Sequence, residues 1–154
     1  MLYFAYGSNC SLAVMFQKRV RFRSRQPATL AGFRLAFSKR SLKPEVPAGV
    51  GFANIHEDKA SAVEGVLYEL VPEDLGLLDA SERYPDHYTR ISVVVKTATR
   101  RIACSAYQAR QDKIAMDLKP SREYLNHLLT AKKWLSPVYY EQLARTEIYL
   151  PPDR

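Results

Sequence analysis

The sequence has few of the residues on which metal and nucleotide sites depend. It holds two cysteines, Cys10 and Cys104, and three histidines, without a CxxC pair or an HExxH run, so it lacks the usual spacings of metal ligands. Two thiols do not make a disulfide framework, and both are expected to be reduced core residues. GxGxxG, P-loop and GxSxG sequences are also missing. No nucleotide cofactor and no serine nucleophile of the hydrolase type is therefore indicated.

Long hydrophobic runs are missing too. No stretch reaches the roughly 18 apolar residues of a membrane helix. The apolar run at the start lacks a basic region before it and is interrupted at Gly7, unlike a signal peptide. We therefore expect a soluble, cytoplasmic protein. With 154 residues, 47% of them hydrophobic and 25% charged, the chain predicts one globular domain over residues 1–154.

Acidic residues are absent from residues 1–44, which hold nine lysines and arginines of a chain whose net charge is +7. This asymmetry indicates either an anionic partner or a basic rim around a site for a small carboxylate. Arginines at every second position from Arg19 to Arg25 would share one side of an extended segment and could bind a phosphate backbone. A solvated basic face is the commoner arrangement.

The apolar pattern predicts strands at 1–6, 28–38, 51–55, 63–70, 91–96 and 102–109, with a turn at 56–59 and a loop at 39–50. Helices are expected after residue 11, with Leu12, Met15 and Phe16 facing the core, from Pro72 towards residue 82, from Pro120, and over 137–143. Because strands cluster instead of alternating with helices, the order predicts an α+β fold with a mixed, closed or strongly curved sheet.

A small polar loop, Gly7-Ser8-Asn9, follows the first predicted strand. A loop between a strand and a helix presents backbone N–H groups that favour an anion such as a carboxylate. The same three residues also form ordinary turns. From the residues alone, both interpretations remain open.

Acidic side chains stand among apolar and aromatic residues in LLDASERYPDHY, residues 77–88. Tyr84 and Tyr88 could desolvate one of the carboxyls of Asp79, Glu82 and Asp86 and suit it to general acid/base work. The alternative is a solvated helix end in which Glu82 pairs with Arg83 or Arg90. Tyrosine is also abundant, with ten residues, and one or two of them could line a pocket.

These segments, taken in order, resemble the gamma-glutamylcyclotransferase family. The resemblance rests on YFAYGSN, ATLAGFRLAF, VEGVLYEL, LDASERYPDHYTR, IACSAYQ and KPSREYL, which together span residues 2 to about 145. It implies a small barrel-like mixed sheet with flanking helices and a cavity at one end. It also implies a reaction in which the α-amine of a γ-glutamyl group attacks its own γ-carbonyl, giving 5-oxoproline and a free amine.

The resemblance further implies the roles of individual residues. Glu82 matches the catalytic general acid/base, while Asp79 is expected to be structural. Strand alternation favours Tyr6 over Tyr3 as a pocket residue. The implied partner is a small γ-glutamyl substrate, with no metal, cofactor, membrane or nucleic acid, in a monomer or homodimer. The implied substrate-binding residues are Tyr3, Tyr6, Gly7, Ser8, Asn9, Tyr107 and Tyr124.

The chain departs from the family pattern at several positions. The family usually has glycine after the catalytic glutamate, where this chain has Arg83. An inward Arg83 would oppose the basicity of the glutamate, and an outward one could bind a second substrate carboxylate. Asn9 and Cys10 are unlike the start of the glutathione-specific branch. The alternative is a non-catalytic or repurposed member that binds an anionic ligand or nucleic acid through residues 18–43.

Overall fold

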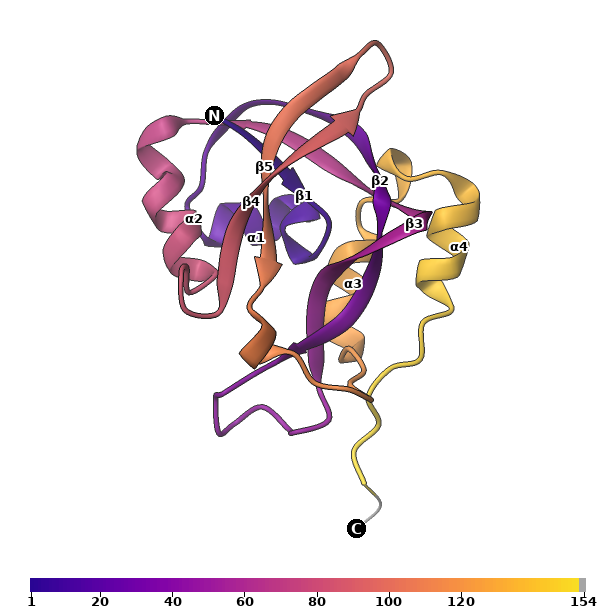
Figure 1. The fold of residues 1–154 in the computed structure, drawn as a ribbon. Helices are drawn as coiled ribbons and strands as arrows, with labels where there is room; N and C mark the ends of the chain where they lie inside the picture. The colour runs from indigo at the N-terminus through magenta and orange to yellow at the C-terminus, as the bar shows by residue number, and fades with distance from the viewer. Residues whose placement is uncertain (153–154) are drawn as a thin grey trace.

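Five strands close into a small barrel in the computed structural model, which describes residues 1–152 (Figure 1). The barrel order is β1-β3-β2-β4-β5, and β1 closes it by pairing antiparallel with β3 and parallel with β5. The predicted α+β fold with a mixed, closed sheet is therefore confirmed. The strands are β1 (Leu2–Ala5), β2 (Phe22–Arg40), β3 (Gly51–Leu70), β4 (Tyr88–Lys96) and β5 (Arg101–Ala109).

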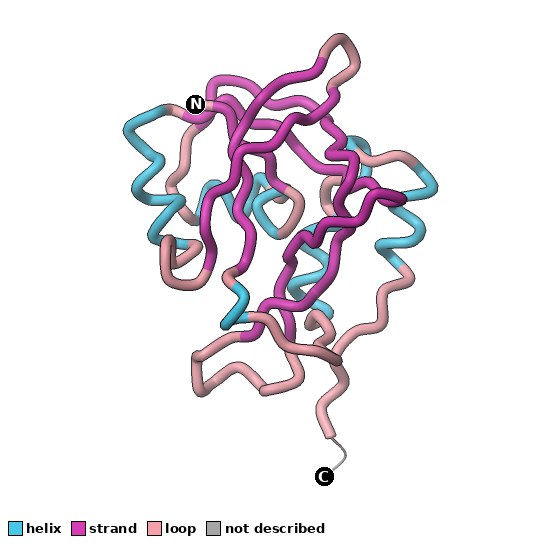
Figure 2. The backbone as a smooth tube through the Cα atoms, viewed as in Figure 1, coloured by secondary structure: helices cyan, strands magenta, loops and turns pink. Residues whose placement is uncertain are grey.

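Four α-helices among the described residues surround the strands (Figure 2). They are α1 (Leu12–Gln17), α2 (Leu75–Ser81), α3 (Arg122–Leu129) and α4 (Pro137–Ala144). Figure 1 shows α2 on one side of the barrel and α4 on the other. Serine side chains cap α1, α3 and α4 by accepting a backbone N–H in the first turn, which satisfies one of the free donors there. Within residues 1–152, no helix has the length and apolar character needed to cross a membrane.

The prediction of a turn at residues 56–59 is wrong. These residues lie inside β3, which runs unbroken from Gly51 to Leu70. The turn-forming residues lie at an irregularity of the strand pairing, where the register between β2 and β3 shifts opposite Gly32 (φ 85°). Here the Asp58 carboxylate accepts hydrogen bonds from Ala60 N and Ser61 Oγ at 3.1 and 2.8 Å. Local turn propensity therefore bends this strand without ending it.

The buried face of α1 also differs from the prediction. Met15 is buried as expected, but Leu12 and Phe16 are 45% and 85% exposed. Val14 and Met15 face the barrel instead, next to the capping residue Ser11. A helix of six residues has fewer than two turns, so its apolar spacing does not define a single inner stripe.

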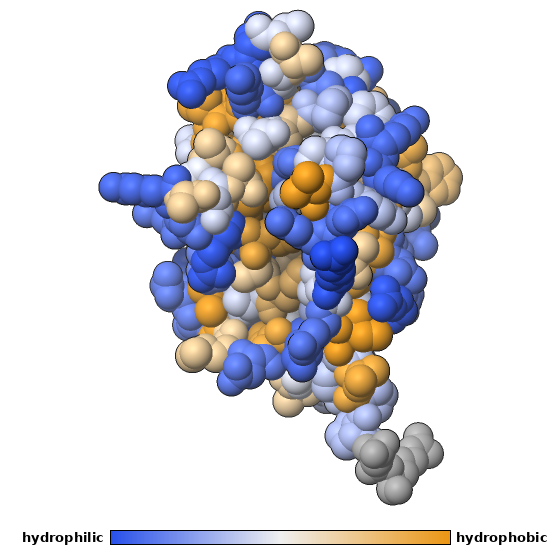
Figure 3. All heavy atoms as spheres, turned by 90° about the vertical axis from the view of Figure 1, so that its right-hand side faces the viewer, coloured by the Kyte–Doolittle hydropathy of each residue, from blue (hydrophilic) through white to orange (hydrophobic). Residues whose placement is uncertain are grey.

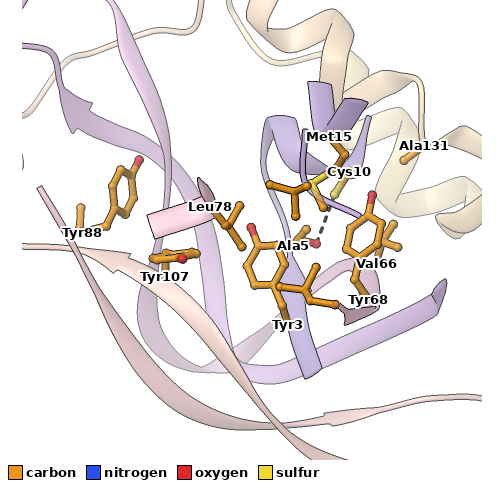
Figure 4. Close-up of a cluster of buried hydrophobic side chains, with 13 residues drawn as sticks. Tyr3, Ala5, Cys10, Met15, Val66, Tyr68, Leu78, Tyr88, Tyr107 and Ala131 are labelled. Atoms are coloured by element: carbon orange, nitrogen blue, oxygen red, sulfur yellow. Dashed lines mark hydrogen bonds between the residues drawn. The ribbon is translucent and has the colours of Figure 1, made fainter. Parts of the chain in front are cut away.

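Tyrosines form much of the core around β1 (Figure 4). The ring of Tyr3 stacks on Tyr68 with 6.2 Å between centroids and meets Tyr107 edge-on at 5.6 Å. Leu78 of α2 packs into the same cluster. On the outside, the face that carries α4 shows hydrophilic side chains interspersed with small hydrophobic areas (Figure 3). The tyrosines of this buried cluster thus bring polar phenol groups into the barrel interior, near the loop that follows β1.

Candidate active site

Glu82 is held at the end of α2 by the geometry of the helix terminus. Arg83 adopts a left-handed conformation (φ 50°), Arg83 N bonds Ala80 O at 3.2 Å, and Tyr84 N bonds Asp79 O at 2.9 Å. This pair of bonds is the Schellman arrangement, in which the residue after the helix cap is most often glycine. The backbone at this position therefore favours glycine, and Arg83 occupies it at a conformational cost.

Asn9 joins Glu82 to two other side chains. Its Nδ2 donates to Tyr3 Oη at 2.8 Å and to Glu82 Oε1 at 2.9 Å, and its Oδ1 accepts from Lys18 Nζ at 2.6 Å. Lys18 Nζ also lies 3.4 Å from Glu82 Oε1. Both protein contacts of the carboxylate use Oε1. Among the hydrogen bonds within residues 1–152, none involves Oε2, which remains available to a bound molecule.

The loop between β1 and α1 forms a 3-10 turn over Ser8–Cys10. The N–H groups of Ser8 and Asn9 open this turn and so have no partner inside it. A side chain at Gly7 would meet Ala53 Cβ at 3.0 Å and Tyr124 Oη at 3.2 Å, so glycine permits the close approach of the loop to these neighbours. Helix α3 packs against the turn and brings Tyr124 to it.

Five tyrosines surround the space in front of Glu82: Tyr3, Tyr6, Tyr88, Tyr107 and Tyr124. Burial is the largest cause that raises the pKa of each one above its usual range. These phenols are therefore neutral near pH 7 and can donate hydrogen bonds, but they do not supply a base.

The orientation of several phenols is fixed by the protein. Tyr6 Oη donates to Tyr107 O at 2.5 Å, and Tyr88 Oη donates to Ala53 O at 2.8 Å. Tyr107 Oη donates to Asp79 Oδ1 at 2.5 Å, and Arg90 Nε lies 3.4 Å from the same oxygen. Asp79 thus contacts Tyr107 and Arg90 rather than the chamber, in line with the structural role expected for it.

Two neighbouring chambers share Glu82 in their walls. The inner chamber has a volume of about 40 Å³ and is bounded by the five tyrosines, residues 7–9, Ala53 and Glu82. The outer chamber, of about 250 Å³, contains basic residues and the loop after β2. The two share Ser8, Glu82, Tyr88 and Tyr124. A molecule that fills both chambers would therefore pass directly beside the Glu82 carboxylate.

The structure brings together all eight residues that the sequence singled out for the site, since each one lines the inner chamber. Tyr3 and Tyr6 do so together, contrary to the expectation from strand alternation, because β1 ends at Ala5 and Tyr6 lies outside the regular strand. The expected pairing of Glu82 with Arg83 or Arg90 is wrong, because Glu82 pairs with Lys18 and Arg90 pairs with Asp79.

Sequence reasoning missed four residues of the two chambers. Tyr88 stood in the LDASERYPDHY segment but was considered only as a neighbour of the carboxyl, and Lys18 only as part of a basic run. Lys39 was likewise considered only as part of the basic segment 18–43, and its contact with His87 was not anticipated because it joins residues 48 positions apart. Within residues 1–152, no group of three histidine, cysteine or acidic side chains is placed to hold a metal ion.

Some arginine side chains of the basic segment near the start of β2 make contacts within the protein. The Arg21 guanidinium bonds both carboxylate oxygens of Asp74, at 2.8 and 3.1 Å. The Arg25 guanidinium lies over the Trp134 ring, 4.6 Å from its centroid. Two of the four alternating arginines therefore have intramolecular partners, and this arrangement does not favour a nucleic-acid surface.

Comparison with solved structures places the chain among cyclotransferases in fold. A structure named gamma-glutamyl cyclotransferase matches with a TM-score of 0.84 and 26% identity, over 99% of this chain and 91% of that one. A protein of Homo sapiens described as uncharacterized matches at 0.81 and 28%, with the same coverage. A glutathione-specific cyclotransferase from yeast matches at 0.65 and 16%, over 93% of each chain, and shows the fold alone.

Comparison with protein families extends this likeness to the sequence. A search of curated proteins found no match. The family model described as "Gamma-glutamyl cyclotransferase, AIG2-like" matches residues 3–134. That match includes β1 from Tyr3 on, the loop at Gly7–Asn9, Glu82, Tyr107 and Tyr124, and it covers most of the 154 residues. The chain therefore belongs to the gamma-glutamyl cyclotransferase, AIG2-like family.

Proposed function

We propose that this protein converts a γ-glutamyl amino acid or γ-glutamyl amine into 5-oxoproline and the free amine. The observation that carries the proposal is the position of Glu82, the one carboxylate that lines the two chambers among the described residues. It stands where the inner and outer chambers meet, facing neutral phenols. An intramolecular attack of this kind needs one group to move protons and a chamber that folds the substrate onto itself.

The inner chamber suits the glutamyl head of the substrate. Its volume of about 40 Å³ holds about three water-sized groups, which matches a carboxylate and the carbon that bears it. The opening N–H groups of the loop at Gly7–Asn9 would hold this α-carboxylate, and the tyrosines would surround the aliphatic chain. This placement brings the α-nitrogen and the γ-carbonyl close together next to Glu82.

The proposed reaction balances with Glu82 alone as proton carrier. The substrate α-ammonium gives a proton to Glu82 Oε2, and its nitrogen then attacks the γ-carbonyl carbon. A new carbon–nitrogen bond forms, Glu82 passes this proton to the leaving nitrogen, and the original amide bond breaks. Glu82 then takes a second proton from the ring nitrogen and passes it to the released amine. Two of the three ammonium protons end on the released amine, which leaves as an ammonium ion. No water or redox partner enters the balance.

The roles of the neighbouring side chains follow from their contacts. Asn9 and Lys18 hold Glu82 Oε1, so the carboxylate keeps one orientation with Oε2 towards the substrate. Tyr3 Oη and Tyr124 Oη accept hydrogen bonds from Asn9 Nδ2 and Ala53 N and keep their own protons free, so they can donate to the oxygen that becomes negative during the attack. Because Tyr107 gives its hydroxyl proton to Asp79, it shapes the chamber and is not a donor to the substrate.

The test is the release of 5-oxoproline from γ-glutamyl-alanine, γ-glutamyl-lysine and glutathione, measured by chromatography. Glu82→Gln keeps the size of the side chain but removes its proton transfer, and we expect turnover to fall by about 100- to 10,000-fold. Glu57→Gln, on an exposed part of β3, is the matched control and should retain full activity. Turnover that persists in Glu82→Gln, or no 5-oxoproline from any substrate, would contradict the proposal.

A further inference from the structure

The outer chamber is where the leaving group of the substrate would lie, an inference that rests on the proposed function. In the proposed reaction the glutamyl head occupies the inner chamber, and Glu82 lines both chambers. The amide bond that breaks must lie near Glu82 for a proton to reach its nitrogen. The amine on the far side of that bond therefore extends into the outer chamber, whose lining will select it.

This lining is strongly basic. It contains four cationic side chains and a single carboxylate, that of Glu82. Lys18 pairs with this carboxylate. Within residues 1–152, the other three cations have no carboxylate oxygen within 4 Å, so their charges are not balanced inside the described protein. These three are Lys39, Lys43 and Arg83.

Lys39 is the most unusual of the three because it is only 7% exposed. Its Nζ lies 2.7 Å from His87 Nδ1 and 5.7 Å from the centre of the Tyr88 ring. Burial lowers the pKa of Lys39 to about 8, and the nearby Arg83 charge acts in the same direction. Burying a cation without a counter-ion is unfavourable, and a bound anion would supply the missing charge.

Three separate segments bring these cations to one space. Lys39 lies near the end of β2, Lys43 belongs to the loop between β2 and β3 that projects from one end of the barrel (Figure 1), and Arg83 follows α2. The left-handed backbone at Arg83 places its side chain at the outer chamber immediately after Glu82. The basic wall thus begins next to the scissile bond.

We propose that Lys39, Lys43 and Arg83 form an anion-binding subsite for the leaving group, so that the protein prefers γ-glutamyl substrates whose leaving amine carries carboxylates. One carboxylate can engage two donors of the subsite, and the third cation favours a leaving group with a second acid, such as glutamate. A leaving group with an added positive charge meets three cations at short range and is disfavoured.

The experiment compares three substrates of similar length: γ-glutamyl-glutamate, γ-glutamyl-glutamine and γ-glutamyl-lysine joined through its α-nitrogen. The first two differ by one charge at nearly constant shape. We expect kcat/KM to fall about tenfold from glutamate to glutamine, as for the loss of one charge-assisted contact, and to fall further for lysine. The measured quantity is the 5-oxoproline formed at low substrate concentration and fixed ionic strength.

Single variants identify the residues responsible. Arg83→Gln and Lys43→Gln, both at exposed positions, should each lower the preference for glutamate over glutamine by about threefold, and Lys39→Met by about tenfold. Lys59→Gln, which removes an exposed lysine of β3 outside both chambers, should leave the preference unchanged. The two exposed variants keep the test informative if Lys39→Met fails to fold.

The outcomes separate the subsite from the reaction. Turnover of all three substrates with equal kcat/KM, or a preference that the variants leave unchanged, overturns the anion-binding subsite and leaves the cyclisation standing. Absence of 5-oxoproline from every substrate overturns the cyclisation and, with it, the leaving-group subsite.

Discussion

Replacing Arg83 by glycine should stabilise the protein, because the backbone at this position is left-handed (φ 50°). A residue with a Cβ loses about 1–2 kcal/mol in this conformation. Glycine avoids that penalty but loses about 0.5–1 kcal/mol more on folding because its unfolded state is freer. Since no hydrogen bond or ion pair of the Arg83 side chain is present within residues 1–152, the net gain should be about 0.5–1 kcal/mol.

Thermal unfolding measures this gain. For a chain of this length, 1 kcal/mol corresponds to a shift in melting temperature of about 2–4 °C, so we expect Arg83→Gly to melt about 1–4 °C above the wild type. Arg83→Ala is the control, because it removes the same charge and keeps the Cβ. It should melt clearly below the glycine variant. An alanine variant as stable as the glycine variant would refute the argument that backbone strain is stored at Arg83.

Two further predictions concern the network around Glu82 and the buried lysine. Asn9→Ala removes the hydrogen bonds that Asn9 donates to Tyr3 and Glu82. We expect kcat to fall by more than tenfold with a smaller change in KM. The free energy of unfolding, measured with denaturant, should fall by about 1–3 kcal/mol. Between pH 7 and 9 the positive charge of Lys39 is lost, since its pKa is about 8. The KM for γ-glutamyl-glutamate should therefore rise relative to the KM for γ-glutamyl-glutamine, and this ratio cancels the titration of the substrate amine. A ratio that stays constant over this pH range would show that Lys39 does not bind the anion. The titratable and charged groups around Lys39 are His87, Tyr88, Arg83, Glu82, Lys113 and Arg40.

The sequence predicted the type and order of the elements better than their extent. The hairpin at 91–109 and the helices near residues 72, 121 and 137 are confirmed. Predicted strands at 51–55 and 63–70 proved to be one strand, because Asp58 bends the chain locally while the long partner strand β2 continues beside it. Pairing between distant strands decides this outcome, and a local pattern does not contain it.

The inner chamber was easier to anticipate than the outer one. Gly7, Asn9 and Glu82 stand in compact motifs whose order along the chain points to a family. The outer chamber depends on contacts such as Lys39 with His87, which are made by residues that look ordinary in the sequence. Burial turns Lys39 from a typical surface residue into an uncompensated charge, and burial is a property of the folded chain.

The pairing of β1 has a consequence for how the protein folds. This strand is synthesised before both of its partners, which lie at residues 66–69 and at Ser105. The barrel therefore cannot close until more than one hundred residues of the chain are available, and such distant pairings form slowly. Since the loop of Gly7–Asn9 is attached to β1, the ability to bind a substrate should appear only with barrel closure. Recovery of activity during refolding would then time this last step.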